Sequence, residues 1–419
     1  MSTPRSSTRS VVTFLVGLAL VIAVAVGAFG WALPLVILSV LAIVMFHEFG
    51  HYLTARLSGM QVTDFFVGFG PPLWSMTHRG TRYGVRAIWA GGYVKVPGMS
   101  WDDAVDPALE PRTYRAATYP RKVLFASAGS LMHLIMALLL AFSALVFVGA
   151  ASPTSIGVAG FVTFDHGVAN AARVAGLKAG DQIVSINGHQ HPTISEIVAN
   201  VQAAPNGTVT LVVLRAGRDV TLVAHPLNGQ SLRVGGQPVT SSKVPVGYLG
   251  IDLRELTTTT PVLSAIPQSF SLVWHTLTEA VASIGHVFSP SEFVTLYHQV
   301  TTPALAAQPS QQAKRPVSIV GVVRVADQAV QSNVGAFLQI LVVLNIFVGV
   351  LNMLPLLPLD GGHVAVATYE RLRRRRGVPY RADLRKMMPV VYAFVTVLLV
   401  LFASTLYLDI AHPIANPFR

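Results

Sequence analysis

Two histidines and a glutamate stand close together in the stretch His47-Glu48-Phe49-Gly50-His51. Residues four apart share one face of a helix, so the imidazoles of His47 and His51 can bind the same metal ion. Glu48 follows the first histidine and can take a proton from a water molecule bound to that metal. The spacing therefore predicts hydrolytic metal chemistry. The alternative is a buried polar cluster that only holds helices together.

A third ligand is needed, because a catalytic zinc site usually takes three protein ligands and a water molecule. Cysteine is absent, so the ligand must be His, Asp or Glu. Asp360 is the candidate, because it follows Pro355 and Pro358, which interrupt an apolar stretch. At membrane depth the unpaired backbone groups of such an interruption are tolerated only beside a cavity or other protein. The alternative for Asp360 is a helix cap at the membrane surface.

The elements that carry these residues are apolar enough to lie in a membrane. Of the 419 residues, 52% are hydrophobic and 12% are charged, whereas soluble domains carry about 25% charged residues. Five stretches are long enough for a crossing of about 20 residues, namely 11–29, 31–47, 123–150, 334–359 and 387–408. A cleaved signal peptide is the alternative for 11–29, but its length and the lack of a cleavage site favour a retained span.

The distribution of Lys and Arg predicts the orientation of these spans. Basic residues gather in the loop 52–122 and in the segment 361–386, and they are sparse over 151–333. The N-terminus and the metal-binding residues are therefore expected on the cytoplasmic side, and 151–333 and the C-terminus outside. The Arg-rich run 371–376 is interpreted as a topology anchor at the lipid bilayer. Despite the net charge of +11, nucleic-acid binding is not expected, because no aromatic residues interleave with this run.

The long outer segment has a different composition. Over 155–255, short alternating runs separated by turns such as Asn187-Gly188 predict a soluble sheet domain. The runs 172–188 and 248–251 resemble a bacterial PDZ domain with its carboxylate-binding loop at the C-terminal end. Such domains bind an extended peptide by strand addition, and an occluded groove is the alternative. The following region, 258–332, is expected to hold an interfacial amphipathic helix and a polar linker.

Taken together, these motifs resemble the intramembrane zinc metalloproteases of the site-2 protease family, of the bacterial type with one PDZ domain. The resemblance rests on the stretch His47 to His51 and on Leu359-Asp-Gly-Gly362, in this order, with the PDZ-like insert between them. It implies an α-helical polytopic membrane protein of about five transmembrane helices, including an extra N-terminal one. It further implies a membrane-re-entrant β-hairpin and an inserted extracytoplasmic PDZ-like α+β domain.

The resemblance also implies the site. His47, His51 and Asp360 would bind one Zn²⁺ per chain, and Glu48 would be the catalytic base. Asn352 matches the family's asparagine ahead of the prolines, which holds the substrate backbone. The hairpin edge that receives the substrate as an added strand would consist of Gly91, Gly92, Tyr93, Val94, Lys95 and Val96.

Two further histidines are candidates near this site. His133 stands where the family usually has an asparagine in its third span. It is either a hydrogen-bond donor to the reacting group or a satisfied core histidine. His363 follows Asp360 by three residues and is expected to support the ligands rather than bind the metal.

The resemblance implies a bacterial inner-membrane enzyme that acts on single-span proteins, such as anti-sigma factors or remnant signal peptides, already cut by another protease. The expected parts of the chain are a tail and extra helix (1–30), the first part of the protease core (31–150), the PDZ-like domain (155–255), the interfacial region (258–332), the second part of the core (333–410) and a tail (411–419). A non-catalytic membrane PDZ adaptor is one alternative, but it would need neither Glu48 nor Asp360. A divalent metal transporter is the other, but it would show internal repeats, and none is seen.

Overall fold

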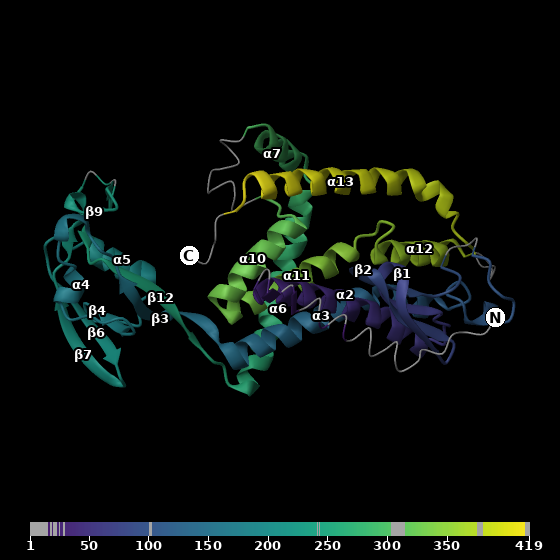
Figure 1. The fold of residues 1–419 in the computed structure, drawn as a ribbon, viewed down its shortest axis with the longest axis horizontal. Helices are drawn as coiled ribbons and strands as arrows, with labels where there is room; N and C mark the ends of the chain where they lie inside the picture. The colour runs from purple at the N-terminus through teal and green to yellow at the C-terminus, as the bar shows by residue number, and fades with distance from the viewer. Residues whose placement is uncertain are drawn as a thin grey trace. The chain divides into compact units, whose positions relative to one another are not determined.

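The computed structural model describes residues 30–414 with gaps at 100–102, 241, 243, 303–314 and 375–379, together with isolated positions between 16 and 27. The chain divides into two compact units (Figure 1). One is Ala144–Ala265, and the other combines Met1–Ser143 with Ile266–Arg419. The extra span expected at 11–29 and most of the expected linker lie outside the described residues.

Within the described residues, four helices are long and apolar enough to cross a membrane. They are α2 (Ala32–Leu57), α3 (Tyr119–Ser143, continued by a π-helical turn to Val148), α11 (Val334–Asn352) and α13 (Met388–Ala411, preceded by the 3-10 turn Leu384–Met387). These helices coincide with four of the five spans predicted from the sequence. Both α2 and α11 pack against α3, which is therefore the central helix of this unit (Figure 1).

Small residues bring α2 close to α3. A Cβ atom added at Gly50 would lie 2.5 Å from Cγ of Met132 and 2.7 Å from the carbonyl oxygen of Ala128. Membrane helices use such small residues to let their backbones approach. Because Gly50 lies between His47 and His51, this contact turns the histidine-bearing face of α2 toward α3.

The other α-helices described in this unit are α6 (Val262–Val287), α7 (Pro290–Thr301), α10 (Ile319–Ser332) and α12 (Asp360–Arg373). Helix α6 covers the stretch in which an amphipathic helix was predicted. One of its faces buries Val273 and Ala280, whereas Trp274 on another face is 67% exposed. As predicted from Pro355 and Pro358, residues 353–359 separate α11 from α12, and Asp360 is the first residue of α12.

A buried ion pair fixes the end of α13 to the start of α10. Nη2 of Arg315 lies 2.7 Å from Oδ1 of Asp409, and the two side chains are 0% and 1% exposed. The backbone N–H of Ser318 donates to Oδ2 of Asp409 at 2.7 Å. Gly321 leaves room for the same carboxylate, because a Cβ atom there would clash with it.

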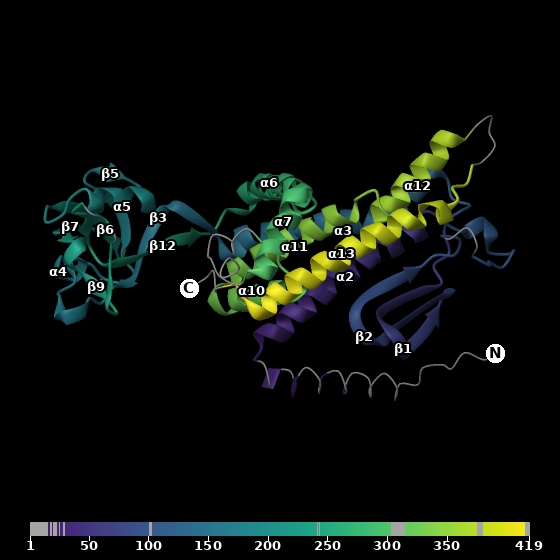
Figure 2. The ribbon, with the colours of Figure 1, turned by 90° about the horizontal axis from the view of Figure 1, so that it is seen from above.

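Strands β1 (Asp64–His78) and β2 (Thr81–Lys95) form a curved hairpin (Figure 2). Residues 64–67 of β1 register with two parts of β2, namely 82–85 and 92–95. The segment 64–67 is therefore central, and the segment 92–95 registers with it along one side only. The end of β2, up to Lys95, is thus an edge of this small sheet, whereas Val96 follows the strand.

The second unit is built on a six-stranded sheet with the order β12-β3-β4-β6-β7, in which β5 pairs with β4. The strands are β3 (Ala150–Phe161), β4 (Gln182–Ile186), β5 (His189–Gln190), β6 (Val209–Arg215), β7 (Arg218–Ala224) and β12 (Ile251–Thr258). The short helix α4 (Ala171–Val174) and the helix α5 (Ile194–Gln202) pack with the sheet around a core that includes Ile183, Ile197 and Leu211. This unit confirms the predicted soluble sheet domain.

A second ion pair lies inside the sheet unit. Nε and Nη2 of Arg215 each donate to the Asp181 carboxylate at 2.7 Å, and the N–H of Lys178 donates to it at 2.8 Å. The hydrogen bonds from Arg215 are the main cause that holds the pKa of Asp181 below its usual range. The carboxylate thus ties the turn before β4 to the end of β6.

Candidate metal centre

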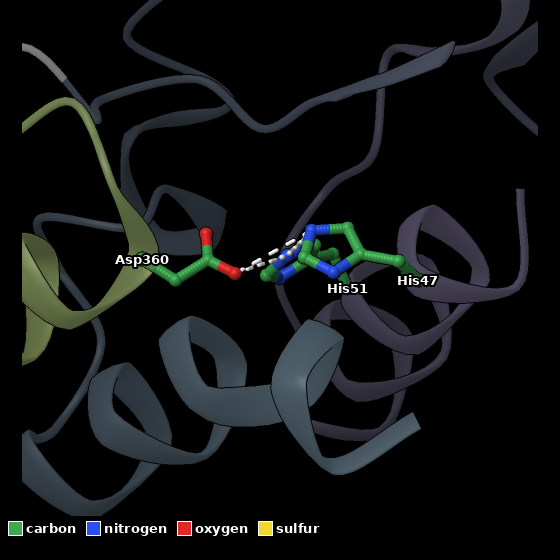
Figure 3. Close-up of side chains that lie close together, drawn as sticks. All are labelled: His47, His51 and Asp360. Atoms are coloured by element: carbon green, nitrogen blue, oxygen red, sulfur yellow. Dashed lines mark hydrogen bonds and ion pairs between the residues drawn. The ribbon is translucent and has the colours of Figure 1, made fainter. Parts of the chain in front are cut away.

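The structure brings together the three residues predicted to bind a metal ion (Figure 3). The Nε2 atoms of His47 and His51, one turn apart on α2, are separated by 3.2 Å. Oδ2 of Asp360 lies 3.4 Å from Nε2 of His47 and 3.3 Å from Nε2 of His51. In Figure 3 the carboxylate, from the start of α12, and the two rings, from α2, point toward one another.

The chemistry of these donors fits a metal ion. Nδ1–H of His51 donates to the carbonyl oxygen of Phe125 at 2.8 Å, which leaves a lone pair on Nε2 for a metal. Oδ2 of Asp360 is buried and makes no hydrogen bond outside this trio. Two imidazole nitrogens and one carboxylate oxygen, with a fourth position left for water or substrate, are a donor set that suits catalytic zinc.

Helix α3 also supports the other histidine. The ring of His47 lies so close to Gly129 that a Cβ atom added there would clash with the ring. Only glycine therefore leaves room for His47 in this position. Gly129 was not predicted as a site residue, because the family pattern points to His133 instead. The available signal was a glycine inside an apolar span.

Glu48 faces the hairpin rather than α3. Its carboxylate lies against the backbone N–H of Val94. A Cβ atom added at Gly92 would lie 2.6 Å from Sδ of Met45 and 3.4 Å from Cγ of Glu48. The edge segment of β2 therefore runs directly along the face of α2 that carries Glu48.

His133 is buried beside the trio. Its ring centroid lies 5.0 Å from that of His47. Nδ1–H of His133 donates to Oδ1 of Asn345 at 3.1 Å, and Nδ2 of Asn345 donates to the carbonyl oxygen of Leu341 at 2.8 Å. The second bond fixes which amide atom of Asn345 accepts from His133. Asn345 was also missed as a site residue, and its only signal was an uncharged polar side chain in a span.

A cavity of about 320 Å³ adjoins His133 and Asn345. It lies between α3, α6 and α11, and Leu277 and Ile346 contribute to its mainly apolar wall. Asn352 is the last residue of α11. His363 lies one turn after Asp360, with its ring centroid 6.4 Å from that of Tyr114, and it is not part of the metal-binding trio.

Known proteins resemble this chain over most of its length. The model of a family described as Peptidase family M50 matches residues 35–399. Zinc metalloprotease Rip1 of Mycobacterium tuberculosis is 30% identical over 405 residues, which cover 91% of this chain and 96% of that relative. Rip1 of Mycolicibacterium smegmatis is 28% identical over 413 residues, covering 92% and 99%. A putative zinc metalloprotease of Agrobacterium fabrum is 29% identical over 368 residues, covering 83% and 88%.

These matches confirm the predicted enzyme class and its metal. The chain is a multi-pass membrane zinc metalloendopeptidase, and the alternatives of a non-catalytic adaptor and a metal transporter are set aside. The cluster of His47, His51 and Asp360 lies inside the matched range. The chain therefore belongs to peptidase family M50, the family of the site-2 proteases.

Proposed function

We propose that this chain cleaves transmembrane segments of single-span membrane proteins, with His47, His51 and Asp360 as zinc ligands and Glu48 as the catalytic base. The observation that carries the proposal is the place of Glu48, on the same helix turn as His47 and against the edge of β2. Bound zinc would polarise the scissile carbonyl and activate water. Glu48 would take the proton from that water and later pass it to the leaving amine.

The edge of β2 would hold the substrate. A transmembrane helix hides its amide groups in its own hydrogen bonds, so the segment to be cut must unwind first. Residues 64–67 register with one side of the segment 92–95, and Val94 lies against Glu48. An extended substrate that pairs with residues 91–96 would replace its lost helical bonds and lie beside the catalytic base. Asn352, at the end of α11, would hold the substrate backbone as well.

His133 and His363 are proposed as positioning residues. His133 packs against His47, and Asn345 uses its side chain to fix the ring of His133. Because Nδ1–H of His133 is already donated to Asn345, the ring supports His47 rather than offering that proton to the substrate. His363 lies one turn beyond Asp360 in α12, with its ring packed near Tyr114, and would support the ligands from there.

The sheet unit is proposed to be a PDZ-like domain outside the cytoplasm. Its antiparallel sheet with α5, and the passage of residues 247–251 beside α5, support this assignment. The domain would either bind a peptide or admit only substrates whose outer domain another protease has trimmed. Such substrates include anti-sigma factors and remnant signal peptides. The membrane is proposed to be an inner bacterial membrane, and the distribution of basic residues supports an orientation with the N-terminus and the metal centre toward the cytoplasm.

The experiment compares wild type with Glu48→Gln in detergent, on a panel of single-span substrates, with bound zinc counted in both. We expect cleavage by the wild type, a loss of at least about 100-fold in the variant, and about one zinc ion in each. The matched control is Glu279→Gln, which changes an exposed glutamate of α6 and should leave cleavage intact. Equal cleavage by wild type and Glu48→Gln would contradict the proposal.

A further inference from the structure

A second cavity, of about 500 Å³, lies where the first turn of α3 meets the C-terminal part of α12. Its wall carries four cationic side chains and three hydroxyl groups, those of Arg115, Lys122, Arg371 and Arg374 and of Thr118, Tyr119 and Tyr380. The single carboxylate in the wall, Glu370, is engaged by Nζ of Lys122 at 3.2 Å and by the N–H of Ala382 at 3.1 Å. Arg115 is itself paired with Glu110, with Nη2 lying 2.6 Å from Oε2. With Lys122 and Arg115 each beside a carboxylate, the net positive charge of the cavity comes from Arg371 and Arg374, and none of the described wall residues belongs to the metal centre.

This cavity lies at the end of a membrane span. The apolar span of α3 begins at Tyr119, which itself forms part of the wall. Tyr119 and Tyr380 are 37% and 41% exposed. Tyrosines together with cationic side chains at the end of a span are typical of the headgroup layer of a bilayer. The cavity is therefore at the level of lipid headgroups.

The arginines of α12 decide which headgroup fits. Arg371 and Arg374 come from the last turn of the helix and the residue after it, and they face the same cavity as Lys122. A guanidinium group binds phosphate oxygens in a bidentate manner. A zwitterionic headgroup would bring its own cation among these cations, whereas an anionic headgroup would not. The chemistry therefore favours a lipid with a net negative headgroup.

We propose that this cavity binds the phosphate headgroup of an anionic phospholipid and that the bound lipid joins α12 to α3. The two helices hold different parts of the metal centre. Helix α3 supplies the carbonyl group of Phe125 that orients His51, and α12 begins with Asp360. A headgroup held by Lys122 on one helix and by Arg371 on the other keeps the third ligand in place relative to the two histidines. An anionic membrane then increases the cleavage rate.

Lipid retention tests the site without reference to proteolysis. The full chain is released from nanodiscs that contain phosphatidylglycerol and phosphatidylcholine, and the retained lipid is identified by native mass spectrometry. We expect the wild type to retain phosphatidylglycerol selectively. The double variant Arg371→Gln/Arg374→Gln should lose about 25-fold in selectivity, because each cationic side chain near an anionic surface contributes roughly fivefold. The double variant Arg371→Lys/Arg374→Lys, which keeps the charge, should retain part of it.

Arg121→Gln is the matched control. Arg121 lies in the same first turn of α3 and is exposed, but it does not contribute to the wall of the cavity. Its variant should retain phosphatidylglycerol as the wild type does. Equal retention by the wild type and the Arg371→Gln/Arg374→Gln variant would overturn the proposal. Binding of free glycerol phosphate without selective lipid retention would also overturn it, because the site would then bind a soluble anion.

Cleavage provides the second readout. In nanodiscs of phosphatidylcholine with phosphatidylglycerol, the wild type and Arg121→Gln should cleave a single-span substrate faster than in phosphatidylcholine alone. The Arg371→Gln/Arg374→Gln variant should show the same rate in both. An equal acceleration of all three proteins would overturn the coupling of the cavity to the metal centre. Because lipid retention does not depend on cleavage, failure here is distinguishable from failure of the proposed protease function.

Discussion

Nδ1–H of His51 donates a hydrogen bond to the carbonyl oxygen of Phe125 on the neighbouring helix, at 2.8 Å. The bond fixes both the tautomer and the plane of the imidazole ring, so that Nε2 faces His47 and Asp360. A backbone carbonyl can do this only while α2 and α3 keep their relative rotation. The metal centre therefore depends on the packing of two spans as well as on its three ligands.

Gly129→Ala should weaken zinc binding. The added Cβ atom would clash with the ring of His47, so the ring must leave its position. We expect zinc affinity and cleavage to fall about 10- to 100-fold, as for other changes beside a metal ligand, while the helices remain folded. Zinc titration and circular dichroism measure the two effects. Gly285→Ala in α6, where the added atom meets nothing within 4 Å, should change neither.

Removal of the metal should abolish cleavage reversibly. A chelator that lowers free zinc below the dissociation constant should stop proteolysis, and added Zn²⁺ should restore it. Asp360→Asn removes one anionic ligand and should require a higher zinc concentration for the same rate. Recovery is measured as cleavage against free zinc. Full activity of the Asp360→Asn variant at the zinc concentration that half-saturates the wild type would contradict the role of Asp360.

The sequence of the substrate helix should control its cleavage. If the substrate unwinds before it pairs with β2, as proposed, replacing valines near the cut site by leucine should slow cleavage severalfold, since leucine has the higher helix propensity. Initial rates on a series of such substrates provide the measurement. The same replacements at the far end of the span serve as the control and should have little effect. Unchanged rates throughout the first series would exclude unwinding as a limiting step.

The stability of the sheet unit should depend on pH through Asp181. The hydrogen bonds from Arg215 lower the pKa of this carboxyl in the folded chain. Their stabilisation is therefore present at neutral pH and is lost as the pH falls through the lowered pKa. Asp181→Asn should cost about 2 kcal/mol near pH 7 and less in acid. Hydrogen exchange of β4 and β6 in the full chain measures this, with the exposed Asp219→Asn as a control that should show no change.

Asp409→Asn should destabilise the helical unit. The change leaves the guanidinium of Arg315 buried without its counter-charge, which typically costs about 3–5 kcal/mol. Thermal unfolding in detergent should show a lower midpoint. The double variant Arg315→Met/Asp409→Leu removes both charges and should recover much of the loss. If Asp409→Asn alone unfolds at the wild-type temperature, the pair does not stabilise the end of α13.

Local spacing made much of the site predictable. His47 and His51 are one helical turn apart, so their common face follows from the period of the helix. The interruption before Asp360 follows from the two prolines, and four spans follow from apolar length. The span expected at 11–29 stays a prediction. The side of the membrane on which each loop lies stays a prediction as well.

Contacts between elements were not predictable in the same way. The contact of Gly129 with His47 and the bond between His133 and Asn345 depend on how each helix is rotated about its own axis. That rotation cannot be predicted from the sequence of any single segment. The double register of residues 64–67 depends likewise on how the long strand β2 bends. Alternation of apolar residues indicates a strand, but it does not indicate which of its parts lies at an edge.

Because residues 353–359 interrupt the helix, the direction in which the Asp360 side chain points does not depend on the length of α11. In one continuous helix, each inserted residue would turn every later side chain by about 100° and aim the carboxylate away from the histidines. Here α12 starts anew and packs on α3, the same helix that orients His51. The span α11 can therefore gain or lose a residue without misdirecting the ligand, whereas one residue inserted between His47 and His51 would separate them onto different faces. Tolerance to insertion thus differs sharply between the two halves of one metal centre.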